Sequence, residues 1–164
     1  MNWHLIIKFF HIIAVTITIG GMFARQLVRG FAKKSEDVKV VASLTNVAVR
    51  IDRAMVIPWS NIMILMGIIL AVMQKWPIFG FLQGSSQNWL LVSNILLILT
   101  MILVGAVFIP YNKRLESIIQ TALAEGRVTP ELSVALDDKV NKLAHYAEEA
   151  FVLIVAALMV LKPF

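Results

Sequence analysis

Four stretches of this sequence are apolar over about twenty consecutive residues. They cover residues 3–23, 54–73, 89–109 and 143–161. An α-helix rises 1.5 Å per residue, so about 20 apolar residues are needed to cross the roughly 30 Å hydrocarbon core of a bilayer. Each stretch meets that length. The sequence therefore predicts four membrane spans within one transmembrane domain, residues 1–164.

The composition agrees with a membrane protein. Apolar residues make up 59% of the 164 residues and charged residues only 15%, and the mean hydropathy is +0.82. A soluble domain carries about 25% charged residues, so this chain lacks the polar surface that a soluble domain needs. The sequence contains no cysteine, which excludes disulfides, iron–sulfur clusters and thiolate metal sites.

The lysines and arginines are divided unequally between the two sides of the predicted membrane. Seven lie between the first and second spans and five between the third and fourth. The opposite side carries only Lys8, Lys75 and Lys162. Lysine and arginine gather in cytoplasmic connections, so we expect both long connections to lie inside and both termini outside.

The two inner connections carry signals for helices of their own. Ser35, followed by Glu36 and Asp37, is typical of a helix start. Thr129 followed by Pro130 is a second start. Apolar residues then recur at helical spacing at Leu132, Leu136, Val140 and Leu143. We expect the fourth helix to begin there and to run on into the membrane. The fold class predicted is all-α, an integral membrane four-helix bundle with helical cytoplasmic extensions.

His11 is the strongest candidate for a functional residue inside the membrane, where ionisable groups are costly. It lies about 12 Å below the outer end of the first span, and His4 lies two turns above it on the same face. A histidine facing the interior of a bundle can be an axial ligand of haem b. Equally, it can bond to a hydroxyl or to a backbone carbonyl of a neighbouring helix. Met66 lies closest to His11 in depth and is a candidate second ligand, although methionine is also a common core filler.

His145 lies about 24 Å from the outer end of its helix, too deep to share one haem iron with His11. Glu148 and Glu149 follow one turn later, a spacing found in di-metal bundles. Such a site needs further carboxylates at the same depth, and Asp52 is the only nearby candidate. A salt bridge from Glu148 or Glu149 to Arg25, Arg50 or Arg53 is therefore favoured over a metal site.

The remaining basic residues favour contact with lipid. Lys8 lies one turn above His11 and can extend toward the outer interface, or pair with a lipid headgroup or a haem propionate. Anionic headgroups are the expected partners of Arg29, Lys33 and Lys34. The sequence has no phosphate loop, nucleophile elbow or zinc-protease motif, so we predict no catalytic residue. The basic residues lack interleaved aromatics, so nucleic-acid binding is not expected.

Three local patterns stand out together: Lys8-Phe9-Phe10-His11-Ile12 with Gly20-Gly21, then Ile109-Pro110, and finally Met159-Val160-Leu161-Lys162-Pro163. Together they resemble a bacterial family of small four-helix integral membrane proteins of unknown function. The resemblance covers nearly the whole chain. It implies a multi-pass protein of the bacterial cytoplasmic (inner) membrane, and it implies no activity.

The first span is also distantly similar to HemJ-type protoporphyrinogen oxidases and to CopD copper-resistance membrane proteins. In the HemJ proteins a Lys-x-x-His-Ile pattern supplies a histidine regarded as a haem b ligand, and His11 matches it. The third span of those oxidases opens Trp-x-His-x-Lys, with a lysine thought to be essential. This chain reads Trp89-Leu90-Leu91-Val92-Ser93 there and lacks both residues. The similarity thus implies haem b binding at His11 without the oxidase activity.

Three hypotheses of function follow from the sequence. The first is a non-enzymatic accessory subunit of a membrane assembly, with a membrane protein partner or a second copy of itself. The second is a b-type haem redox protein that uses His11, with His4, Lys8 and Met66 as further candidate cofactor-binding residues. The third, transport of a metal or a small solute, needs a polar path, and the few polar residues of the spans do not supply one.

Overall fold

The computed structural model describes residues 2–163, and within them the secondary structure is entirely helical. In chain order the elements are α1 (Trp3–Lys34), α2 (Val38–Ile51), η1 (Asp52–Val56), α3 (Ile57–Met73), η2 (Gly80–Gln83), α4 (Trp89–Leu103), η3 (Val104–Phe108), α5 (Ile109–Glu125), α6 (Pro130–Leu136) and α7 (Lys139–Leu161).

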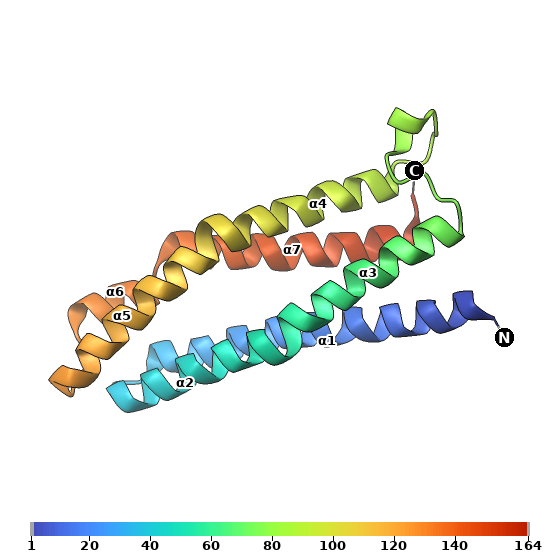
Figure 1. Ribbon diagram of the computed structural model, residues 1–164. Helices are drawn as coiled ribbons and strands as arrows, with labels where there is room; N and C mark the ends of the chain where they lie inside the picture. Colours follow the sequence, from blue (N-terminus) through green and yellow to red (C-terminus); the bar gives the residue numbers. More distant parts are fainter. Residues whose placement is uncertain (1, 164) are drawn as a thin grey trace.

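These elements form four long arms (Figure 1). They are α1, α2–η1–α3, α4–η3–α5 and α6–α7, and each is long and apolar enough to cross a membrane. The four predicted spans each fall inside one arm. The all-α four-helix fold class is therefore confirmed.

Two of the arms contain a π-helical segment at the same distance from a proline. Pro58 follows η1 and Pro110 follows η3, each six residues after the segment begins. The backbone N–H of Ile57 donates to the carbonyl of Asp52, and that of Ile109 to the carbonyl of Val104, both five residues back. Proline has no N–H, and its ring crowds the carbonyl four residues earlier. The wider π turn before each proline accommodates that crowding.

The helix caps differ in part from the expected positions. Asp37 caps α2 by accepting from the N–H of Lys39, whereas Ser35 lies at the C-cap of α1. Thr129 caps α6 as expected, through the N–H of Leu132. The expected continuous fourth helix is interrupted: α6 ends at Leu136, and α7 begins anew with Asp138 as its cap. Asp138 accepts from the N–H of Asn141, which fixes the new start.

The arms associate as two pairs. In Figure 1, α3 lies along α1, α4 lies along α7, and both ends of the chain lie at the same end of the molecule. At the other end, α2, α5 and α6 pack together around a small core. Its buried residues are Val38, Val41, Leu115, Ile118, Ile119, Ala122, Leu132 and Ala135. This core joins the two pairs and confirms that the connections are folded helices.

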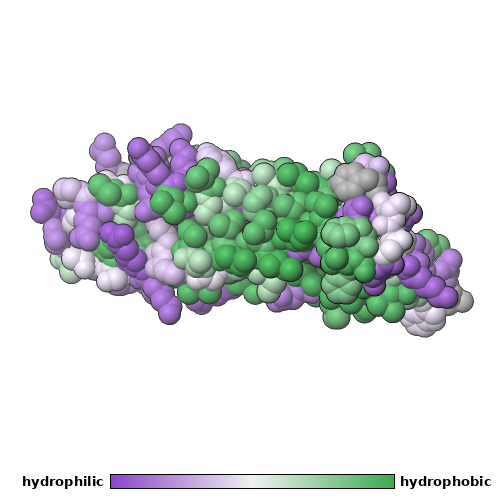
Figure 2. Space-filling model, turned by 90° about the horizontal axis from the view of Figure 1, so that it is seen from above, coloured by the Kyte–Doolittle hydropathy of each residue, from purple (hydrophilic) through white to green (hydrophobic). Residues whose placement is uncertain are grey.

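The surface matches the predicted membrane position. Figure 2 shows a continuous apolar area over the middle of the molecule and hydrophilic residues gathered at the end formed by α2, α5 and α6. At the opposite end, the Lys162 ammonium lies 4.0 Å from the ring centroid of Trp76. Trp76 also meets the buried Trp89 edge-to-face. Trp76, in the loop after α3, thus contacts both the residue that follows α7 and the first residue of α4.

Candidate functional site

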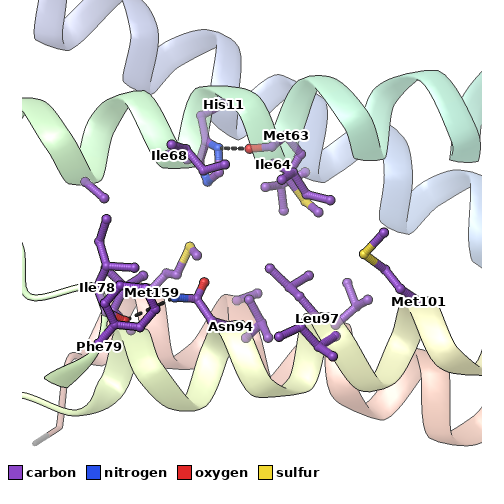
Figure 3. Close-up of a pocket in the computed structure, with 18 residues that line it drawn as sticks. His11, Met63, Ile64, Ile68, Ile78, Phe79, Asn94, Leu97, Met101 and Met159 are labelled. Carbon is purple, nitrogen blue, oxygen red and sulfur yellow. Dashed lines mark hydrogen bonds between the residues drawn. The ribbon is translucent and has the colours of Figure 1, made fainter. Parts of the chain in front are cut away.

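A cavity of about 340 Å³ lies between the two helix pairs (Figure 3). Its walls come from α1, α3, α4, α7 and the loop after α3. The polar lining residues are His11 and Asn94. The others are Val15, Met63, Ile64, Gly67, Ile68, Ala71, Ile78, Phe79, Leu90, Leu97, Ile98, Met101, Val152, Val155, Ala156 and Met159. The cavity is therefore an apolar space with two isolated polar groups.

The imidazole of His11 is held by the helix beside it. Its Nδ1 lies 2.9 Å from the backbone carbonyl oxygen of Met63. A carbonyl can only accept, so Nδ1 carries the hydrogen and donates it. In the neutral ring, Nε2 then has a free lone pair. Figure 3 shows this second nitrogen directed into the cavity. The expected alternative of a carbonyl-bonded histidine is what the structure shows, and it leaves one ring nitrogen for a ligand.

Gly67 gives the ring of His11 room beside α3. A Cβ atom at position 67 would lie only 3.2 Å from Cε1 of His11, closer than nearly all real Cβ contacts. The imidazole therefore packs closely on α3 at a position one turn from the carbonyl of Met63. The packing of α1 on α3 therefore positions the ring as well as the helices.

Asn94 lies on the opposite wall of the cavity, on α4. Its amide nitrogen Nδ2 donates to the backbone carbonyl of Ile78 at 3.2 Å. Because that carbonyl can only accept, the bond also fixes which side of the amide is nitrogen. The amide oxygen Oδ1 consequently faces away from the loop and toward the cavity, as Figure 3 shows.

The structure places the other predicted cofactor-binding residues outside the cavity wall. His4 is half-buried, with a buried Nε2 that has no hydrogen-bond partner among residues 2–163. Lys8 is exposed. Met66 does not line the cavity, whereas Met63, one turn earlier, does. Of the four residues predicted, His11 alone reaches the site.

A second polar site lies at the junction of the four arms. Arg25 on α1 is 4% exposed and donates to Asp52 at 2.8 Å and to Glu148 at 2.6 Å. The expected salt bridge from Glu148 to Arg25 is confirmed. Arg29 reaches the second Asp52 oxygen at 3.7 Å. Two arginines thus face two carboxylates, and the group has no net charge. We call Arg25, Arg29, Asp52, His145 and Glu148 the charge cluster.

His145 is the centre of the charge cluster. Its Nδ1 lies 3.1 Å from a Glu148 carboxylate oxygen, and Nη1 of Arg29 contacts its Nε2. In a consistent assignment Nδ1 donates to Glu148 and Nε2 accepts from Arg29, while Nη2 of Arg25, 3.3 Å from Nδ1, donates to Glu148 and not to the ring. The Phe108 ring stacks on the imidazole at a centroid distance of 4.1 Å. The charge cluster itself comes from α1, η1 and α7, and the Phe108 ring of η3 packs on it, so contacts at this point join all four arms.

The expectation for Arg29 is corrected by these contacts, whereas Lys33 is exposed and its contact with lipid stays a prediction. Arg29 was expected to bind lipid headgroups, but its guanidinium is turned inward to His145, Asp52 and Asn112. Lys33 bonds to the carboxylate of Asp137. In residues 2–163, no three His, Asp or Glu side chains are arranged so that they could hold a metal ion.

The cavity and its polar groups were only partly visible in the sequence. Asn94 stood out as a polar residue in a span, but its bond to Ile78 depends on how the loop after α3 folds back. No short-range pattern encodes that contact. Likewise, Arg29 faces inward because it lies one helical turn after Arg25 and so on the same face of α1. A hydropathy plot averages over all faces of a helix and does not show this.

The class of protein is decided by the helices: four arms of this length and hydropathy make the chain a polytopic α-helical membrane protein. More narrowly, residues 5–163 match the model of DUF2269, described as a predicted integral membrane protein, and the chain belongs to that family. Its expected membership of a membrane protein family of unknown function is thereby confirmed. No curated protein and no solved structure matches the chain.

Proposed function

We propose that this protein binds one apolar ligand in the cavity between its helix pairs, and that the ligand enters from the bilayer. The observation that carries the proposal is the cavity itself, with about 340 Å³ of space and two polar atoms directed into it. Sites for small ligands commonly measure about 300–1,000 Å³ and combine apolar walls with a few placed polar groups.

The position of the opening supports entry from the membrane. Several lining residues are also exposed on the apolar surface, among them Ile68 at 54% and Met101 at 66%. Since this surface corresponds to the predicted spans, the cavity opens toward hydrocarbon. A molecule dissolved in the bilayer reaches it without crossing water.

Haem b is the occupant implied by the similarity of the first span to HemJ-type and CopD proteins. The residues fit such a ligand at one point: His11 Nε2 has a free lone pair, and its Nδ1 is held by the carbonyl of Met63. A metal-binding histidine usually has this arrangement, because the second bond fixes the tautomer and the orientation of the ring. Bound haem would supply one-electron transfer, and His11 would hold it from the side of α1.

An accessory role in a membrane assembly is a second candidate. The arm Trp89–Glu125 is the least buried of the four within the chain. It forms one wall of the cavity, and a second membrane protein or a second copy seated on it would close the opening. The proposed setting is the bacterial cytoplasmic membrane, with both termini outside.

The test of the proposal compares two neighbouring alanines on α7. Ala156 lines the cavity, whereas Ala157 is exposed. The protein is purified in mild detergent, and bound molecules are identified by lipid mass spectrometry and by absorption spectra before and after dithionite reduction. We expect Ala156→Phe to lose the bound molecule and Ala157→Phe to retain it.

The outcome also separates the candidate occupants. A Soret band that disappears in His11→Ala identifies haem b. If the bound molecule is apolar and the spectrum has no Soret band, the proposal of an apolar ligand is supported and haem b is excluded as that ligand. If Ala156→Phe and Ala157→Phe carry the same molecules as the unmodified protein, the cavity is not a binding site. A stoichiometric protein partner that leaves the cavity empty would then favour the accessory role.

A further inference from the structure

The two polar atoms that face the cavity are both hydrogen-bond acceptors. Nε2 of His11 has a lone pair because Nδ1 donates to the carbonyl of Met63. The Oδ1 atom of Asn94 faces the cavity because Nδ2 donates to the carbonyl of Ile78. Each residue is thus oriented by a backbone carbonyl, which can only accept, and presents its accepting side to the ligand.

The rest of the wall offers no competing donor. Among the described lining residues there is no hydroxyl, lysine, arginine or indole, and the methionine sulfurs are weak acceptors. No carboxylate lines the cavity either, so nothing there stabilises a charged imidazolium, which is costly in an apolar membrane site. The neutral, lone-pair form of His11 is the one that fits its surroundings.

From this we infer that the ligand is a bilayer-soluble molecule that donates hydrogen bonds through hydroxyl groups. The inference rests on the proposed function and specifies its ligand class. A ligand carbonyl next to Nε2 or Oδ1 would put two acceptors together and leave both without a hydrogen bond. A ligand hydroxyl donates its hydrogen to Nε2 or Oδ1, so that the ligand and the side chain each have a hydrogen-bond partner.

A reduced isoprenoid quinone fits these requirements most closely. Its hydroquinone ring carries hydroxyls at opposite ends, and Figure 3 shows His11 and Asn94 on opposite walls of the cavity. The apolar lining suits the ring, and the opening toward hydrocarbon leaves room for a prenyl tail. Lipid alcohols share the same hydroxyl chemistry and are the second source of such a ligand.

The experiment compares ligands that differ only in donor capacity. Decylubiquinol and decylubiquinone are titrated into the protein in lipid nanodiscs under anaerobic conditions, and the dissociation constants are measured by calorimetry. Farnesol and its methyl ether form a second pair. We expect the hydroxyl member of a pair to bind about tenfold tighter or better, which corresponds to about 1.4 kcal/mol.

Variants assign the preference to the two acceptors. His11→Phe and Asn94→Leu are each expected to bring the ratio of the two constants toward one. Met66→Leu, on α3 but outside the cavity wall, is the matched control and should leave the ratio unchanged. A preference confined to farnesol supports the inference and names a lipid alcohol as the ligand.

Three other results would overturn the inference in distinguishable ways. If neither pair shows tighter binding of its hydroxyl member, the cavity accepts apolar ligands without selecting for a donor, and only the proposed function is supported. A quinol preference that survives both His11→Phe and Asn94→Leu places the donor contact elsewhere. If neither pair binds and Ala156→Phe changes nothing, the proposed function fails together with the inference.

Discussion

Arg25 shows at the scale of one residue why the charge cluster matters for stability. Its guanidinium is 4% exposed and faces Glu148, which is also 4% exposed. A buried pair gains little over an apolar replacement, but removing one partner leaves an uncompensated buried charge. The charge cluster should therefore respond strongly to single substitutions and weakly to matched double substitutions.

We expect Glu148→Gln to lower the free energy of unfolding by about 3 kcal/mol, because Arg25 loses one of its two carboxylates in a buried site. The double variant Arg25→Met/Glu148→Leu, which removes both charges, should cost clearly less. Unfolding followed by circular dichroism during SDS titration in mixed micelles measures both. A double variant as unstable as the sum of the single variants would contradict this account.

Asp137→Asn is the matched control for Glu148→Gln, since it breaks an ion pair that lies in water. Asp137 lies in the turn between α6 and α7, outside the predicted spans, and accepts from Lys33. The hydrogen bond from Lys33 holds the pKa of Asp137 below its ordinary value. The contribution of the pair is present at neutral pH and is lost only as the pH falls through that lowered pKa. We expect no measurable change in stability from this substitution.

At this scale the sequence predicted single residues better than their partners. His11 and the Arg25–Glu148 pair were identifiable because ionisable residues are rare and costly in spans. Met66 was a candidate ligand on depth alone, whereas the contact with His11 is made by the backbone of Met63. Depth along a helix can be read from residue counts, but the rotation of one helix against another cannot.

At the scale of elements, the two π segments position the charge cluster. Asp52 begins η1 and Phe108 ends η3, and both contact cluster residues. A π turn holds an extra residue, so it rotates the helix before it by about 100° relative to the helix after it. The paired prolines thus set which residues of α2 and α4 face inward.

Pro58→Ala tests this role. The alanine N–H can donate to the carbonyl four residues back, which favours a regular α turn in place of η1 and turns Asp52 away from Arg25. We expect Asp52→Asn to cost about 3 kcal/mol in the unmodified protein and clearly less in the Pro58→Ala background. The same double-mutant cycle with Pro77→Ala, in the loop after α3, is the control and should show no loss of coupling.

The sequence predicted the elements themselves but not every boundary. The start at Thr129 was clear because a capping residue precedes proline. The break between α6 and α7 was missed because Leu136, Val140 and Leu143 keep a helical spacing across it. The signal that existed was Asp138 three residues before Asn141, whose N–H it caps.

For the whole molecule, the predicted orientation follows from where the arms end. Both termini lie at one end, and the hydrophilic region of α2, α5 and α6 lies at the other. The chain has no cysteine, so single cysteines can be introduced without a background of native thiols. We expect Asn2→Cys to react with a membrane-impermeant maleimide in intact cells and Glu125→Cys to react only after permeabilisation. The reverse pattern would invert the topology.

The architecture was largely predictable, because bilayer thickness fixes the length of a span and backbone satisfaction leaves helices as the simplest solution. The cavity was not. It depends on how α1–α3 and α4–α7 pair, and the surrounding lipid is as apolar as the side chains that line it. Hydropathy therefore cannot distinguish a residue facing lipid from one facing a cavity.

The proposed opening of the cavity toward hydrocarbon changes which concentration governs the binding of a ligand. The occupancy of the site then depends on the mole fraction of the ligand in the lipid phase. Partitioning from water into the bilayer takes place before the ligand reaches His11, so it does not add to the affinity of the site. In this proposal an empty site is in contact with lipid acyl chains, so a ligand that binds replaces part of an acyl chain. A very apolar compound gains nothing from its apolarity in that exchange. Selectivity is left to the few polar atoms that a hydrocarbon chain cannot satisfy.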